Sequence, residues 1–123
     1  MNTSTLDNLS DDELIDRFAI VAKERGAAVL DSETRRANRM FDRMRAIDTV
    51  LRSRGRGARM KLVRLMDEND RFIRYYAALY LLGIVPDRAR AIIEWNHKYW
   101  FDALAGDAGM LLLALDRGEY KPD

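Results

Sequence analysis

Residues 67–83 read DENDRFIRYYAALYLLG, a short polar turn followed by an apolar run of helical length. When this run is placed on a helix, its apolar side chains cover almost the whole circumference. A helix that is apolar on every side cannot lie on the surface of a protein and needs other helices around it. The segment therefore predicts a helical domain with this helix at its centre.

The order of residue types in this segment resembles the second helix of a HEAT or armadillo repeat. An acidic turn is followed by Ile73 and Arg74, then by the small pair Ala77 and Ala78, and then by Leu81. The turn before Ile73 is about one residue longer than the usual repeat pattern, so the pattern leaves the first residue of the helix open. The resemblance implies an all-α fold of stacked antiparallel helix pairs.

Apolar periodicity and capping signals predict six helices and no strand along the 123 residues. The predicted helices run from the capping box Ser10–Glu13 to near Gly26, from Asp31 or Ser32 to Gly55, from Ala58 to Met66, over the central segment to Gly83, from Pro86 to Trp100, and from Gly106 to Gly118. Within them we expect Trp100 and Met110 to face the core.

Short loops pair these helices in chain order, first with second, third with fourth and fifth with sixth. Stacking the pairs gives an all-α, HEAT- or armadillo-like right-handed stack of about three antiparallel helix pairs. A compact orthogonal six-helix bundle is the alternative topology, and periodicity does not separate the two. We expect one domain over residues 1–123, with flexible segments at 1–9 and 119–123.

Four short stretches extend the resemblance over most of the chain: LSDDEL at 9–14, FDRMRAI at 41–47, DAGM at 107–110 and LDRG at 115–118. In this order and spacing they resemble a small bacterial family described as a domain of unknown function with a HEAT-like helical fold. The resemblance implies an all-helical repeat fold and brings with it no catalytic residue, cofactor or substrate.

Composition excludes several classes of chemistry. The chain has no cysteine, which excludes disulfides, thiolate metal sites and thiol nucleophiles. Residues 1–5 lack the basic and apolar regions of a secretory signal, and the longest apolar stretch, residues 75–85, is too short to span a bilayer. We therefore expect a cytoplasmic protein that does not enter the membrane.

The polar residues form no catalytic constellation. His97 is the only histidine, and the serines lie at predicted helix ends or turns. Glu94 and His97 have the half-site spacing of di-iron bundles, but nothing in the chain repeats that motif. Gly55-Arg56-Gly57 lacks the spacing and the Lys-Ser/Thr of a phosphate-binding loop. We expect a protein that is not an enzyme and that holds no metal or cofactor.

Charge is unevenly distributed although the net charge is only +1. Residues 1–34 carry eight acids against three bases, whereas residues 35–64 carry ten arginines and Lys61 against Asp42 and Asp48. The basic segment 35–64 is a candidate site for nucleic acid or another polyanion. The alternative, which we favour, is that the acidic and basic segments neutralise one another in the fold.

The function expected from these features is a non-catalytic scaffold that binds a protein or peptide. The candidate partner-binding residues, expected on the surface, are Arg39, Arg43, Arg71, Arg74, Tyr75 and Trp95. Polyanion binding through residues 35–64 and an immunity- or antitoxin-like accessory role are the alternatives. Homodimerisation is a further expectation, because the end faces of a short solenoid have to be capped or paired.

Overall fold

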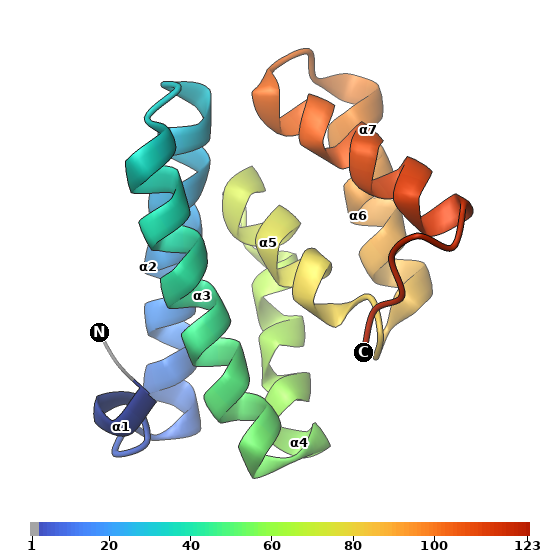
Figure 1. The fold of residues 1–123 in the computed structure, drawn as a ribbon. Coiled ribbons are helices and arrows are strands. Elements are labelled where there is room, and N and C mark those ends of the chain that lie inside the picture. Colours follow the sequence, from blue (N-terminus) through green and yellow to red (C-terminus); the bar gives the residue numbers. More distant parts are fainter. Residues whose placement is uncertain (1–2) are drawn as a thin grey trace.

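The computed structural model describes residues 3–123, and these residues form only helices and connecting turns. Figure 1 shows the elements in chain order. They are α1 (Thr3–Leu6), α2 (Asp11–Leu30), α3 (Thr34–Arg54), α4 (Arg56–Met60), the 3-10 helix η1 (Lys61–Asp67), α5 (Arg71–Leu81), α6 (Pro86–Tyr99) and α7 (Ala103–Asp116). The all-α class predicted from the sequence is confirmed.

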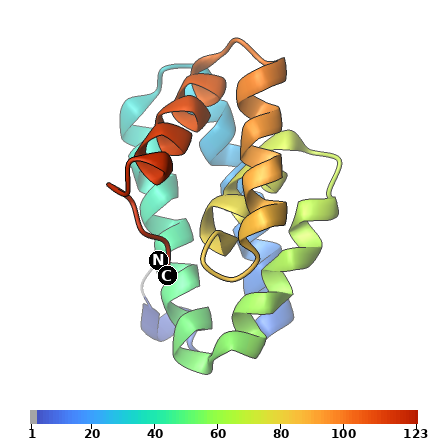
Figure 2. The same cartoon turned by 90° about the vertical axis from the view of Figure 1, so that its right-hand side faces the viewer.

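Consecutive long helices run in opposite directions and pack as neighbours (Figures 1 and 2). α2 pairs with α3, the arm made of α4 and η1 pairs with α5, and α6 pairs with α7. This is the predicted pairing of three antiparallel hairpins. The likeness to HEAT repeats in particular remains an expectation from the sequence.

α5 lies in the middle of the molecule, enclosed by α2, η1 and α6. None of its residues is exposed, and Ala77, Ala78 and Leu81 have no accessible surface at all. Its start is fixed by Asp70, whose carboxylate accepts hydrogen bonds from the backbone amides of Phe72 and Ile73. The prediction that this apolar helix is surrounded by other helices is confirmed.

The capping box at the start of α2 is also confirmed, but its predicted end is wrong. The Ser10 hydroxyl accepts from the Glu13 amide and the Glu13 carboxylate accepts from the Ser10 amide, each at 3.1 Å. The helix then continues through Gly26 to Leu30. Gly26 is buried because the ring of Phe72 from α5 packs where its side chain would be. This glycine allows a close helix contact and does not end the helix.

Three other predicted boundaries need correction. α3 begins at Thr34, and neither Asp31 nor Ser32 caps it. The predicted helix 58–66 is two elements, the short α4 and the tighter η1. α7 begins three residues before Gly106, because the Asp102 carboxylate accepts from the Ala105 amide and provides an earlier cap.

The predicted core positions of Trp100 and Met110 are wrong as well. α6 ends at Tyr99, so Trp100 has extended backbone and leaves the apolar face that it would share on a longer helix. α7 buries Leu104, Ala105 and Ala108 against its neighbours, which turns Met110 outward with 68% of its surface exposed.

The end segments were expected to be flexible. Residues 1–2 lie outside the described part of the chain. Thr3–Leu6 form α1, and the Leu6 side chain is fully buried. Residues 119–123 follow α7 and run down beside α3 (Figure 2), and the Asp123 backbone lies against Gly83 just after α5. Among residues 3–123, no helix combines the length and the hydropathy needed to cross a bilayer.

Two glycines test the close contact between α2 and α5. A methyl group at Gly26 would lie 2.2 Å from Cγ of Phe72, whereas one at Gly106 would meet nothing within 4 Å. Gly26→Ala should therefore destabilise the protein by about 1–3 kcal/mol through overpacking. Gly106→Ala should stabilise it by up to about 1 kcal/mol, the usual effect in an open helix. Urea unfolding of both variants measures this, and a stabilising Gly26→Ala would show that the helices do not approach this closely.

Candidate protein interface

Four aromatic side chains gather where α6 ends and turns into α7. We call Trp95, Tyr99, Trp100 and Phe101 the aromatic corner. The Trp95 ring centre lies 6.0 Å from that of Tyr99 and 6.5 Å from that of Trp100. All four are exposed large hydrophobic residues, and Phe101 is 99% exposed. A cluster of large amphipathic rings on a surface is typical of protein interfaces.

Arg71, at the start of α5, holds the chain beneath this corner. Its guanidinium forms two hydrogen bonds with the Asp102 carboxylate, and its Nε donates to Oδ1 of Asn96 at 3.0 Å. The guanidinium carbon also lies 3.9 Å from the centre of the Trp100 ring. Arg71 and Asn96 are buried, so the contacts join α5, α6 and the connection before α7 in one network.

This network explains why Phe101 points outward. Both of its chain neighbours are fixed, Trp100 by stacking on Arg71 and Asp102 by the ion pair with the same guanidinium. Asp102 additionally caps α7, and the hydrogen bonds from Arg71 hold the pKa of its carboxyl below the ordinary value of 3.8. Phe101 is therefore presented by an anchored turn. A segment whose backbone is already held in place loses less conformational entropy when it binds.

Cationic side chains lie beside the aromatic rings. The Arg74 guanidinium carbon is 5.3 Å from the Trp95 ring centre, and Lys98 Nζ is 5.2 Å from that of Tyr99. Arg74 donates to the backbone carbonyls of Glu68 and Asn69, and within residues 3–123 neither cation has a carboxylate within 4.0 Å. The corner is thus apolar with a basic edge.

Of the six residues expected to bind a partner, two are not on the surface. Arg71 is buried by its ion pair with Asp102, and Tyr75 is enclosed in the core edge-on against Tyr76. Burial also raises the pKa of the Tyr75 hydroxyl. The expected exposure of these two residues is wrong, because the first turn of α5 lies under α6 and the residues that follow it.

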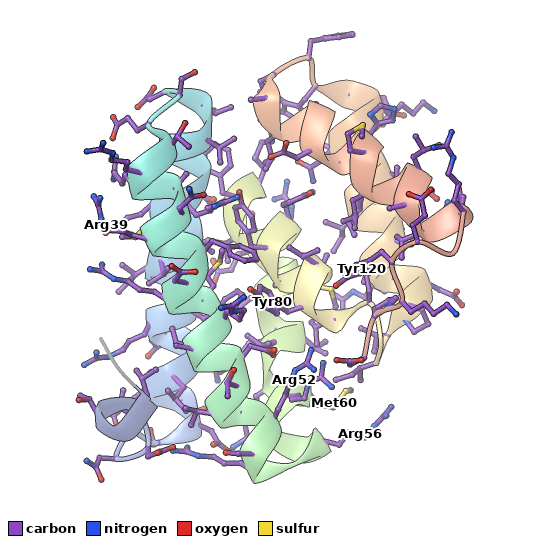
Figure 3. The ribbon with its side chains drawn as sticks, viewed as in Figure 1. Arg39, Arg52, Arg56, Met60, Tyr80 and Tyr120 are labelled. Carbon is purple, nitrogen blue, oxygen red and sulfur yellow. The ribbon has the colours of Figure 1, made fainter. Side chains whose placement is uncertain are left out.

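The other four candidates fall into two groups. Arg74 and Trp95 contact each other at the aromatic corner and border one hollow of about 450 Å³ between η1, α5 and α6. Arg39 and Arg43 lie on α3, and Figure 3 shows Arg39 pointing away from the rest of the molecule. The structure therefore adds Tyr99, Trp100 and Phe101 to Arg74 and Trp95, and leaves the α3 arginines apart.

The acidic start of the chain pairs with part of the basic segment. Asp11 binds Arg54 and Lys61 at 2.8 and 3.0 Å, and Asp12 binds Arg64 at 3.1 Å. Bonding to Arg54 and Lys61 also lowers the pKa of the Asp11 carboxyl. The favoured expectation that these segments neutralise each other is confirmed for these pairs. Polyanion binding itself stays a prediction.

The His97 ring contacts the backbone of α7. Its Nδ1 lies 3.2 Å from the Ala105 carbonyl oxygen, and its ring packs against Gly109 of α7. Within residues 3–123 no three His, Asp or Glu side chains gather in the manner of metal ligands.

Comparison with known proteins places this architecture in a family. The model of a domain of unknown function, DUF2019, matches residues 12–116, and the chain belongs to this family. The crystal structure of protein RPA1889 from Rhodopseudomonas palustris CGA009 is similar at a TM-score of 0.85 and 34% sequence identity. That similarity covers 96% of this chain and 98% of the other. No curated protein matches the sequence.

The Arg71–Asp102 pair predicts a local effect of acid. Because the folded-state pKa of Asp102 is lowered, its contribution is complete above pH 3.8 and is lost as the pH falls through the folded value. Both tryptophans lie at the corner, so their emission should shift below pH 3.8 as the connection loosens.

Asp102→Asn is the control for this titration, because asparagine still caps a helix but carries no charge. The variant should have an altered emission spectrum at neutral pH and no transition of its own in this pH range. An identical transition in both proteins would assign it to other carboxyl groups and contradict the role given to Asp102.

Proposed function

We propose that this protein is a non-catalytic binding module that inserts Phe101 into an apolar pocket of a partner protein. The observation that carries the proposal is the 99% exposure of Phe101 between two residues anchored by one buried arginine. Residues that dominate interface energies are large, central and surrounded by further contacts. Trp95, Tyr99 and Trp100 form a ring cluster on the adjoining surface, which would add further contacts around the inserted Phe101.

The chemistry of the corner also defines the partner. Arg74 and Lys98 lie at its edge, and within the described residues neither has a carboxylate within 4.0 Å. A partner with acidic groups around its pocket would complement this edge, and complementary charge speeds association and selects the partner. We therefore expect a partner surface with an apolar centre and an acidic rim.

Absence of catalysis is part of the proposal. The Asp102 carboxylate at the corner is paired with Arg71, and Nδ1 of the nearby His97 lies at hydrogen-bond distance from the Ala105 carbonyl. A general base or nucleophile needs a lone pair directed at a substrate. These contacts support a surface that binds a partner protein and catalyses no reaction.

Affinity capture from the organism that encodes the chain tests the proposal with two matched variants. Phe101→Ala should lose the captured partner, with affinity at least about 30-fold weaker, because a central aromatic anchor contributes about 2 kcal/mol or more. Ile20→Ala removes another exposed apolar side chain, 61% exposed on α2, and should bind as the unchanged protein does.

Both substitutions are at exposed positions, so each should change the free energy of unfolding by less than about 0.5 kcal/mol. Thermal unfolding checks that the variants remain folded. A recurrent partner that binds Phe101→Ala as tightly as the unchanged protein would refute the corner as its site.

A further inference from the structure

A second hollow lies on another side of the molecule, between α3, α5 and the segment that follows α7. We call residues 119–123 the closing segment and the hollow beneath them the groove. The groove encloses about 450 Å³ and its apolar lining comes from Phe41, Leu79, Tyr80, Tyr120 and Pro122. In Figure 3 the side chains of Arg52, Tyr80 and Tyr120, from three different elements, border the opening.

The closing segment is placed over the groove by a sharp turn. Gly118 has φ +71, a left-handed conformation that glycine adopts without strain, and the amides of Glu119 and Tyr120 then donate to the Ala114 carbonyl. The chain leaves α7 in this way and runs back towards the end of α5. Its backbone comes so close to Gly83 that a methyl group there would lie 1.9 Å from the carbonyl carbon of Asp123.

Two arginines bind the last residue of the closing segment. Arg52 Nη1 donates to the Asp123 carboxylate at 2.8 Å, and Arg59 Nη1 donates to the Asp123 backbone carbonyl at 2.8 Å. Arg59 also donates to the Tyr80 carbonyl, which fixes it to α5. One carboxylate and one carbonyl of an extended segment are thus recognised together, as in the binding of a peptide.

The groove also contains polar atoms that the closing segment does not satisfy. Asp48 is only 3% exposed; its Oδ2 accepts from Arg52 Nε, while its Oδ1 has no hydrogen-bond partner among residues 3–123. The hydroxyl of Tyr80 is buried without a partner within the same residues. Burial raises the pKa of the Asp48 carboxyl, opposed by Arg52. A backbone N–H of a longer or deeper peptide would supply the donor that Asp48 lacks.

The charge at the mouth of the groove favours an acidic ligand. Arg45 lines the groove and has no carboxylate within 4.0 Å among residues 3–123, in addition to the two arginines that bind Asp123. The Asp48 carboxylate is already paired with Arg52, which leaves an excess of positive charge. An acidic residue of a ligand would meet this excess.

We propose that the groove binds an extended acidic peptide segment of a partner protein, and that the closing segment occupies the same place as an intramolecular competitor. The peptide carboxylate takes the position of Asp123 on Arg52, and an apolar side chain three residues earlier takes that of Tyr120. The site is separate from the aromatic corner and does not depend on the function proposed for it.

Competition within one chain has a measurable consequence. A segment tethered next to its site acts at an effective concentration in the millimolar range, so it weakens the apparent affinity of any peptide added from outside. Loosening the closing segment without changing the groove should therefore strengthen peptide binding. Asp123→Ala does this, because it removes the Asp123 carboxylate and leaves the groove residues of α3 and α5 in place.

The probe is the hexapeptide GEYKPD, the sequence of residues 118–123, titrated into the chain of residues 1–123 and followed by shifts of backbone amide and arginine Nε resonances. Asp123→Ala should bind it about two- to fivefold more tightly than the unchanged protein does, the range expected for loss of one exposed ion pair. The shifts should centre on residues 79–83 and on Arg52. The peptide GEYKPN, which lacks only the side-chain carboxylate of its last residue, should bind Asp123→Ala at least twofold more weakly.

Gly83→Ala is the second variant, since its methyl group fills the place of the Asp123 backbone. It should bind neither peptide measurably, with helical circular dichroism verifying its fold. If Gly83→Ala does not fold, the affinities of the two peptides for Asp123→Ala still test the proposal.

Equal binding of GEYKPD and GEYKPN, or no saturable shift in Asp123→Ala at millimolar peptide, would overturn the proposal. Phe101→Ala should leave all these peptide affinities unchanged. Failure of the groove proposal can therefore be distinguished from failure of the function proposed for the aromatic corner.

Discussion

The enclosure of α5 is the constraint on which the rest of the structure depends. An apolar helix with no polar face is stable only when neighbours remove it from water on all sides. α2, η1 and α6 do this, and the small residues Ala77 and Ala78 of α5 and Gly26 of α2 allow the helices to approach closely. Both candidate binding sites follow from this arrangement, because the two ends of the same helix reach them. Arg71 lies at its start under the aromatic corner, and Tyr80 near its end lines the groove.

Arg71 is the buried charged residue of this enclosed helix, and its role is positional. A buried ion pair is weak evidence for stability, since desolvation of the charges offsets much of their attraction. The pair with Asp102 fixes the path of the chain between α6 and α7. Along this path Trp100 stacks on Arg71, and Phe101 points outward into solvent. The groove has a comparable device in Arg52, which joins the buried Asp48 to the closing segment. In both places an arginine joins elements that are distant in the sequence.

Local signals in the sequence predicted the fold well. The capping box at Ser10, proline in the first turn of α6 and the apolar run of α5 each act over a few residues, and each was confirmed. Features that depend on distant residues were not predictable from such signals. Gly26 lies within a helix, and the Phe72 ring of α5 occupies the place where a side chain at position 26 would be. Arg71 is buried and has an ion-pair partner, Asp102, that lies 31 residues further along the chain. The exposure of Phe101 depends in turn on that pair, so the sequence indicated Trp95 and Arg74 as candidates but did not single out Phe101.

Native-state hydrogen exchange of the backbone amides tests the central position of α5 most directly. A helix enclosed on all sides should exchange only when the whole protein unfolds, so amides in the Tyr76–Leu81 part of α5 should have opening free energies equal to the global value. Outer helices such as α7, with apolar side chains on the surface, should open at lower free energy. Exchange of α5 through local openings, faster than exchange in α2 and α3, would contradict the account.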